Sequence, residues 1–184
     1  MRKNETIYRL TTCALMTALM CVLGPMSIQI GLVPVSFTNL VIYLAVYLLG
    51  RKGAVVSTSV YLLLGAVGMP VFSGYEGGLG KLVGPTGGYL IGFLFMALIC
   101  GFIMEKFHRN VVITIFGMIV ATLVDYLFGT VWFVLQMQCD VWYALTVCVF
   151  PFPVFDFGKI LLAIVFGKAI RTALMKSKLL PTQK

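Results

Sequence analysis

Long apolar runs, separated by short polar or glycine-rich segments, make up most of the 184-residue chain. A membrane-spanning helix needs about 20 predominantly apolar residues, and several runs reach or approach that length. The pattern predicts an all-α integral membrane protein with six transmembrane helices, organised as a single membrane domain over residues 1–184. The predicted spans are about residues 10–30, 38–50, 54–68, 87–104, 111–135 and 154–170.

Breaks in these runs come where glycine, proline or charge interrupts the apolar pattern. The uncharged segment 29–37 is typical of a short irregular connection, and the polar residues 51–53 predict a tight turn. The fifth span is expected to break or bend near Gly129. Pro151 and Pro153 lack the backbone N–H that a helix interior needs, so they divide the last apolar stretch and start the final helix near residue 154.

Composition agrees with a membrane protein and excludes a soluble domain. Hydrophobic residues make up 60% of the chain and charged residues 11%, whereas soluble domains carry about 45–50% and roughly 25%. The mean hydropathy of +1.03 also excludes disorder, which needs low hydrophobicity and high net charge. Six spans would take about 120 residues, which leaves no room for a second domain of ordinary size.

The net charge of +8 is explained by the orientation of the chain in a membrane. With six spans, twelve of the 14 basic residues fall on one side, Lys81 falls on the other, and Lys159 lies within a span. Cytoplasmic loops carry the excess of lysine and arginine, so both termini are predicted to be cytoplasmic and nucleic-acid binding is not favoured. The twelve are Arg2, Lys3, Arg9, Arg51, Lys52, Lys106, Arg109, Lys168, Arg171, Lys176, Lys178 and Lys184.

Cysteine and histidine give no sign of a metal site or of a disulfide framework. The five cysteines form no CxxC pair, and His108 is the single histidine. Structural zinc needs clustered cysteine and histidine ligands, so we expect no metal.

Apart from Lys168, which closes off the last helix, three charged residues lie inside the predicted spans, where charge is costly and marks a functional site by default. Asp156 and Lys159 are three residues apart on one helix, so their side chains share a face. The pair either fixes helix packing or serves a ligand; the second is favoured because desolvation offsets the attraction within a buried ion pair. Asp125 has no local partner, and a structural and a functional role are both open.

The glycine-rich segment 71–88 is the least regular part of the chain. Gly80 and Lys81 match part of a phosphate-binding P-loop, but Tyr75 stands where that motif needs glycine and Leu82 where it needs a hydroxyl. Glycines let the backbone approach a ligand closely. We therefore expect an outer lid loop between the third and fourth helices.

Small residues recur at helical spacing in two places. Gly84, Gly88 and Gly92 are four residues apart, which predicts close helix packing at the start of the fourth span. Ala14 and Ala18 repeat this spacing on the first span.

Polar residues also stand near the predicted outer ends of the helices. Asn39 and Tyr89 begin the second and fourth spans, and Tyr43 lies one turn below Asn39 on the same face. Together with Asp156 and Lys159 they supply donors and acceptors within aromatic and apolar walls, which suits a small amphipathic molecule.

Several motifs resemble one known family, the biotin-specific substrate-binding (S) component of energy-coupling factor (ECF) transporters, called BioY. The resemblance runs from about residue 10 to 170, although glutamine is common where Thr38 stands and some members carry arginine near Glu76. The motifs are residues 33–39 (VPVSFTN), 64–74 (LGAVGMPVFSG), 77–80 (GGLG), 84–89 (GPTGGY), 128–132 (FGTVW) and 156–159 (DFGK).

The resemblance implies a protein that captures biotin from outside with high affinity, as the transported ligand and not as a cofactor, and that is not an enzyme. It implies docking of the first span, through Ala14 and Ala18, onto a transmembrane coupling (T) subunit with two ATP-binding cassette ATPases. The expected location is the plasma membrane of a prokaryote, as a multi-pass protein.

The resemblance also implies roles in a binding site. Asp156 would accept hydrogen bonds from the ureido N–H groups of biotin, Asn39 would complete the ureido contacts, and Lys159 would balance Asp156 or donate to the ligand. The other expected contacts are the loop around Ser73, Gly74 and Tyr75, the side chains of Tyr43 and Tyr89, and Lys81, which would face the valerate carboxylate.

Other functions are compatible with a small membrane protein. An S component for another vitamin would share the same architecture. A metal-dependent intramembrane enzyme needs a ligand cluster that this chain lacks, and a serine–lysine dyad with Lys159 has no serine nearby in sequence. An exporter or channel would need polar residues through several spans, whereas most of these spans are apolar.

Overall fold

The computed structural model describes residues 2–29, 33–107 and 110–176. Predictions that involve residue 30, His108, Arg109, Lys178 and Lys184 lie outside these ranges. The elements in chain order are α1 (Arg2–Leu23), β1 (Ser27–Gln29), β2 (Pro34–Ser36), α2 (Thr38–Ala66), α3 (Leu79–Val83), α4 (Gly87–Lys106), α5 (Val111–Met137), α6 (Val141–Cys148) and α7 (Pro153–Lys176).

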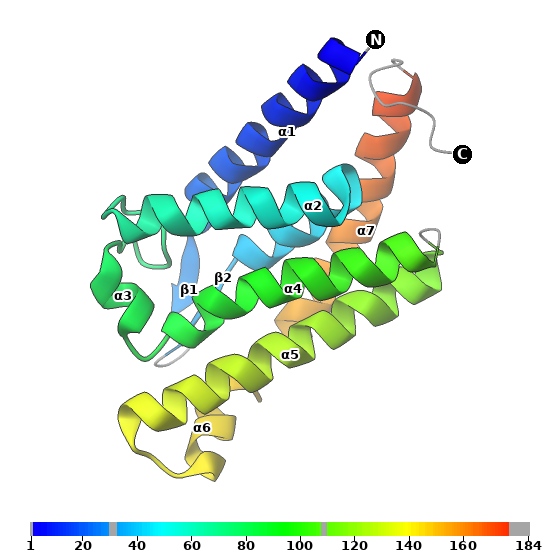
Figure 1. Cartoon of the computed structure of the whole chain (residues 1–184). Coiled ribbons are helices and arrows are strands. Elements are labelled where there is room, and N and C mark those ends of the chain that lie inside the picture. The colour runs from blue at the N-terminus through cyan, green and yellow to red at the C-terminus, as the bar shows by residue number, and fades with distance from the viewer. Residues whose placement is uncertain (1, 30–32, 108–109, 177–184) are drawn as a thin grey trace.

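Long helices form one bundle around a shared apolar core. Figure 1 shows α4 and α5 as a long antiparallel pair, and α4 also packs against α2, which in turn contacts α1 and α7. The main core lies between these helices and includes Tyr43, Met96, Met118 and Ile160. A second cluster, which includes Val35, seats the hairpin β1–β2 against α5 and α6.

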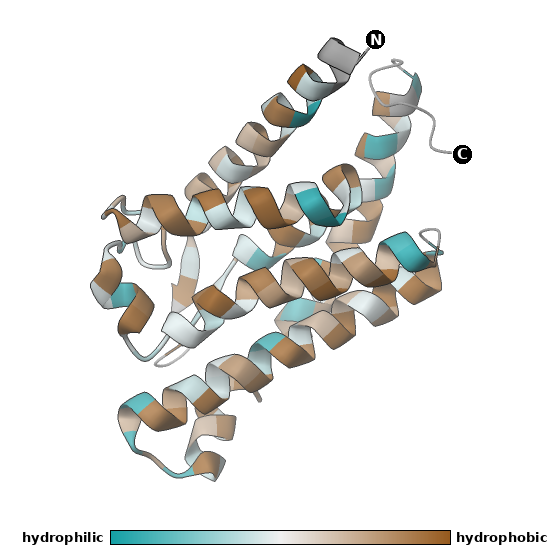
Figure 2. Cartoon of the chain, in the orientation of Figure 1, coloured by the Kyte–Doolittle hydropathy of each residue, from teal (hydrophilic) through white to brown (hydrophobic). Residues whose placement is uncertain are grey.

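Within the described residues, four helices are long and apolar enough to cross a membrane: α1, α2, α4 and α5. The pair α6 and α7, bent by 44°, adds a fifth if it forms one span. Figure 2 shows apolar residues along the length of the helices, with many of the hydrophilic positions gathered near helix ends. The chain is therefore a mostly helical, multi-pass membrane protein.

The helix α2 consists of two halves that meet at Gly50, whose backbone is not helical (φ 73°, ψ −176°). Thr38 and Tyr61 line the same cavity, although a straight helix would separate them by roughly 34 Å. The chain therefore reverses at Gly50, and Figure 1 shows α2 turning back on itself. The turn predicted over residues 51–53 is misplaced, because those residues are helical and only glycine adopts this positive φ readily.

The first helix ends earlier than predicted, and a hairpin follows it. α1 stops at Leu23, and β1 pairs with β2 antiparallel, with Ile28 opposite Val35. The prediction of an irregular connection over residues 29–37 is therefore wrong for β2, whose Val35 is buried while Pro34 and Ser36 are partly exposed. A strand of three residues is too short to show this alternation in sequence.

Glycines hold α4 and α5 in close contact, which confirms the packing predicted for Gly88 and Gly92. The prediction is wrong for Gly84, which caps the end of α3 and precedes α4. A Cβ atom at Gly88 would overlap Trp132 of α5, and one at Gly129 would overlap the ring of Tyr89. Of the break or bend predicted near Gly129, the break is wrong, because α5 continues through this residue. This glycine serves interhelical approach and leaves the helix unbroken.

Basic side chains gather at one end of the bundle. Figure 1 places the start of α1, the turn of α2, the end of α4 and the end of α7 toward the same end. There the Arg51 backbone N–H and guanidinium contact Glu105 at 2.9 and 3.4 Å, and Lys106 lies over the rings of Phe102 and Phe107.

Candidate functional site

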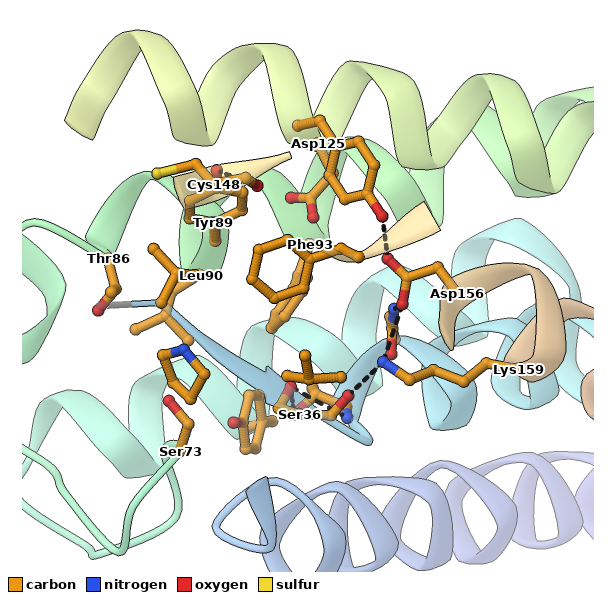
Figure 3. Close-up of a pocket in the computed structure, with 18 residues that line it drawn as sticks. Ser36, Ser73, Thr86, Tyr89, Leu90, Phe93, Asp125, Cys148, Asp156 and Lys159 are labelled. Atoms are coloured by element: carbon orange, nitrogen blue, oxygen red, sulfur yellow. Dashed lines mark hydrogen bonds and ion pairs between the residues drawn. The ribbon is translucent and has the colours of Figure 1, made fainter. Parts of the chain in front are cut away.

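A cavity, termed the central cavity, lies among β2, the first turn of α2, the start of α4, the middle of α5 and the first turns of α7 (Figure 3). α4 and α7 begin at this cavity and end in basic residues, so the cavity lies in the half of the bundle opposite the basic end. The space between its side chains is about 60 Å³, well below the roughly 300–1,000 Å³ typical of small-ligand sites. A ligand of vitamin size therefore requires the cavity to open.

Asp156 is the central polar group of the cavity wall. Its Oδ1 accepts hydrogen bonds from Asn39 Nδ2 at 2.7 Å and from Lys159 Nζ at 2.8 Å, and its Oδ2 accepts one from the Tyr126 hydroxyl. Asp156 and Lys159 are only 5% and 6% exposed. The shared helix face predicted from their spacing is confirmed, and the pair also joins three other elements.

Neighbouring backbone groups orient two of the three hydrogen-bond partners of this carboxylate, Lys159 and Asn39. Lys159 Nζ also donates to the Ser36 carbonyl oxygen of β2 at 2.7 Å. The Asn39 Oδ1 accepts from the Leu40 N–H at 3.0 Å, which turns the Asn39 amide nitrogen toward Asp156. Hydrogen bonds to charged groups are the stronger class, so these bonds fix the Asp156 carboxylate relative to α2, α5 and β2.

Tyr89 and Ser73, two of the residues predicted to contact the ligand, also line the central cavity. The Tyr89 ring lies against Gly129, and its hydroxyl donates to the Cys148 carbonyl oxygen at 3.2 Å. Tyr43 is fully buried one turn below Asn39, where its hydroxyl bonds to Thr122, and it is not among the lining residues described.

Three predicted loop residues lie away from the cavity lining in the described structure. Tyr75 is 68% exposed, and the Gly74 N–H bonds to the Pro25 carbonyl oxygen at 3.2 Å. Lys81 forms an ion pair with Glu76 at 2.8 Å, beside a separate surface depression.

Several residues that line the central cavity were not predicted from the sequence. Phe93 lies one turn after Tyr89, a spacing that could have placed it on the same helix face. Tyr61 and Ser36 carried no such signal, because the reversal at Gly50 and the hairpin bring them to the cavity. Tyr126 follows Asp125, whose role was open, and both line the cavity.

Ala14 and Ala18 lie together on an exposed face of α1. The opposite face of α1 packs on the second half of α2, where Thr17 Oγ1 donates to the Ser57 carbonyl oxygen at 3.1 Å.

Comparisons with known proteins agree with this architecture. Biotin transporter BioY2 of Lactococcus lactis subsp. cremoris is 34% identical over 172 residues, which cover 94% of both chains. A probable biotin transporter BioY of Pyrococcus horikoshii is 33% identical over 158 residues, 86% of this chain and 93% of that one.

A crystal structure of the S-component for biotin from an ECF-type ABC transporter superposes with a TM-score of 0.87 at 30% identity. The superposition covers 94% of this chain and 95% of that one. The BioY family model matches residues 1–176. Family match, relatives and fold agree over nearly the whole length: the chain belongs to the BioY family.

Proposed function

We propose that this protein is the S component of an ECF-type vitamin importer and that it captures biotin in the central cavity. The observation that carries the proposal is the buried Asp156 carboxylate, held by Asn39, Tyr126 and Lys159 in a wall of that cavity. Membership of the BioY family supports biotin as the ligand, since the relatives are named as biotin transporters.

The chemistry of biotin suits this wall. Biotin carries a ureido group with two N–H donors and one carbonyl acceptor, fused to an apolar thioether ring. Asp156 accepts a ureido N–H, while Asn39 and Lys159 donate their remaining N–H groups toward the ureido carbonyl and keep their bonds to Asp156. Leu90, Phe93 and other apolar lining residues cover the thioether ring.

The loop between α2 and α4 acts as a lid in this proposal. The cavity of about 60 Å³ admits biotin only after part of its wall moves. Gly68, Gly74 and Gly78 all have positive φ, and the loop can re-form over the ligand with Ser73, Gly74 and Tyr75 near the valerate chain. Lys81 would then leave Glu76 and face the carboxylate.

Six spans follow if the two halves of α2 each cross the membrane and the bent pair α6–α7 counts as one. This makes a single membrane domain over residues 1–184, with spans near those predicted. Arg51, Lys106, Lys168 and Arg171 lie at the basic end, and the excess of basic residues in cytoplasmic loops supports cytoplasmic termini in a prokaryotic plasma membrane.

Import requires partners. The exposed face of α1 around Ala14 and Ala18 would dock onto a T subunit with two ATPases, because small residues permit close helix approach in a membrane. The cavity would capture biotin on the outer side, and the assembled complex would release it inside at the expense of ATP.

Calorimetric titration of the detergent-purified protein tests the ligand. We expect tight, saturable binding of biotin and a matching rise in the unfolding temperature, because a ligand that binds only the folded state stabilises it. A larger thermal shift with thiamine or riboflavin would replace biotin with another vitamin. Labelled-biotin uptake into vesicles, with and without the ATPase partners, separates capture from energised transport.

A further inference from the structure

Asp125 has a buried carboxyl group that takes no part in the hydrogen bonds described around Asp156. It is 4% exposed, lines the central cavity from α5, and its Oδ1 has no hydrogen-bond partner within the described residues. Figure 3 shows its carboxyl group directed into the space beside Tyr89 and Phe93, separate from the bonds around Asp156.

The nearby donors are already engaged elsewhere. The Tyr126 hydroxyl donates to Asp156, the Tyr89 hydroxyl to the Cys148 carbonyl, and Lys159 to Asp156 and to Ser36. A buried carboxyl group without a partner is unfavourable, more so inside a membrane. The position therefore costs the folded protein free energy.

The neighbouring helix makes room for this carboxyl group. A Cβ atom at Gly92 of α4 would overlap Asp125 Oδ1, so only glycine at position 92 allows the observed placement. The Asp156–Lys159 pair is electrically balanced within itself. Asp125 consequently has no cation in that pair left to neutralise it.

The acceptor capacity of Asp156 is nearly used. A carboxylate offers about four lone-pair sites, and Asn39, Lys159 and Tyr126 occupy three of them. About one site is left for a ligand donor, whereas a ureido group presents two N–H groups.

We propose that Asp125 is a second ligand-contacting acceptor, which takes the ureido N–H that Asp156 cannot accommodate. The inference rests on the proposed capture of biotin in the central cavity. Each ureido N–H group then donates to its own carboxylate, one to Asp156 and the other to Asp125. The preferred ligand is therefore one whose ring carries two N–H donors.

The test uses the full-length protein in detergent, with biotin and two analogues that each carry a methyl group on one ureido nitrogen. Calorimetry should show Asp125→Asn binding biotin about 10- to 100-fold more weakly than the unaltered protein, the range for hydrogen bonds to charged groups. In the unaltered protein, both analogues should bind more weakly than biotin. In Asp125→Asn, the analogue methylated on the nitrogen that faces Asp125 should bind nearly as well as biotin does to that variant. The analogue methylated on the other nitrogen should still bind more weakly than biotin, by the same factor as in the unaltered protein.

This crossed comparison separates contact from structure, because a residue that only supports the fold would not distinguish the two nitrogens. Equal biotin affinity in Asp125→Asn, or unchanged losses for both analogues, would overturn the inference. Asp140→Asn is the matched control, since Asp140 caps α6 outside the cavity lining and asparagine caps equally well. Failure of the unaltered protein to bind biotin would instead reject the proposed function.

Gly92→Ala supplies a second route that keeps the carboxyl group. Gly92→Ala alone should displace Asp125 and weaken biotin binding. The double variant Gly92→Ala, Asp125→Asn should bind biotin with nearly the same affinity as Asp125→Asn alone. Fully additive losses would contradict a shared role.

Discussion

Lys159 and Ser36 are 123 positions apart in the chain, yet the Lys159 ammonium lies 2.7 Å from the Ser36 carbonyl oxygen. The same ammonium lies 2.8 Å from the Asp156 carboxylate. This buried cation therefore joins the hairpin to the first turns of α7 beside the central cavity, so a change at Lys159 should alter both stability and ligand binding.

Lys159→Met should lower the free energy of unfolding by about 3–5 kcal/mol, because it leaves the Asp156 carboxylate buried without its cation. Biotin affinity should fall at least tenfold, about 1.4 kcal/mol. Thermal unfolding and calorimetric titration measure the two effects. Lys168→Met, on an exposed position of the same helix, should change neither.

The double variant Asp156→Leu, Lys159→Met should recover part of the lost stability, since replacing both members of a buried pair removes the unpaired charge. It should not recover biotin binding. Binding at the affinity of the unaltered protein would show that the pair serves packing alone.

Asp156→Asn should weaken biotin binding at least tenfold, because truncating one partner of a desolvated, hydrogen-bonded contact costs about 2–5 kcal/mol. The amide keeps an oxygen that can accept from Asn39 and Lys159, but its NH2 replaces the oxygen that accepts from the Tyr126 hydroxyl, and the negative charge is lost. Calorimetry with Glu105→Gln as control, a change at the opposite, basic end, measures the effect. Unchanged affinity would remove Asp156 from the site.

Gly129→Ala should destabilise the protein and weaken biotin binding, because its methyl group would overlap the Tyr89 ring and push it into the cavity. Gly158→Ala is a matched control, since a Cβ there meets nothing within 4 Å. That control should be neutral or up to about 1 kcal/mol more stable. Equal unfolding temperatures for the two variants would contradict the close approach of α4 and α5.

Lys81→Met tests the contact proposed for the carboxylate end of the ligand. It should weaken binding of biotin but not of biotin methyl ester, which lacks the negative charge. A parallel loss for both ligands would assign Lys81 to loop structure, through its ion pair with Glu76, and not to ligand contact.

Ala14→Trp and Ala18→Trp should leave biotin affinity intact and abolish uptake into vesicles that contain the ATPase partners. Both residues are exposed on α1, and a bulky ring prevents close helix approach. Leu127→Trp, on an exposed position of α5, should leave uptake intact. Normal uptake by these tryptophan variants would contradict docking of the T subunit on the face of α1 around Ala14 and Ala18.

Much of the site could be anticipated where the signal is local. The membrane class followed from the scarcity of charge, because so few charged residues cannot cover a surface in water. The pairing of Asp156 with Lys159 followed from helix geometry, since residues three apart share a face. The packing role of Gly88 and Gly92 followed from the same geometry.

The sequence by itself determined the class of protein, the positions of most long helices and the buried pair at the start of α7, because each depends on neighbours along the chain. Only the tertiary structure decided which distant groups meet that pair. The reversal at Gly50 brings Tyr61 beside Thr38, the hairpin brings Ser36 to Lys159, and α5 places Asp125 in the cavity wall. Such contacts arise from packing between elements, for which spacing along the chain holds no local signal.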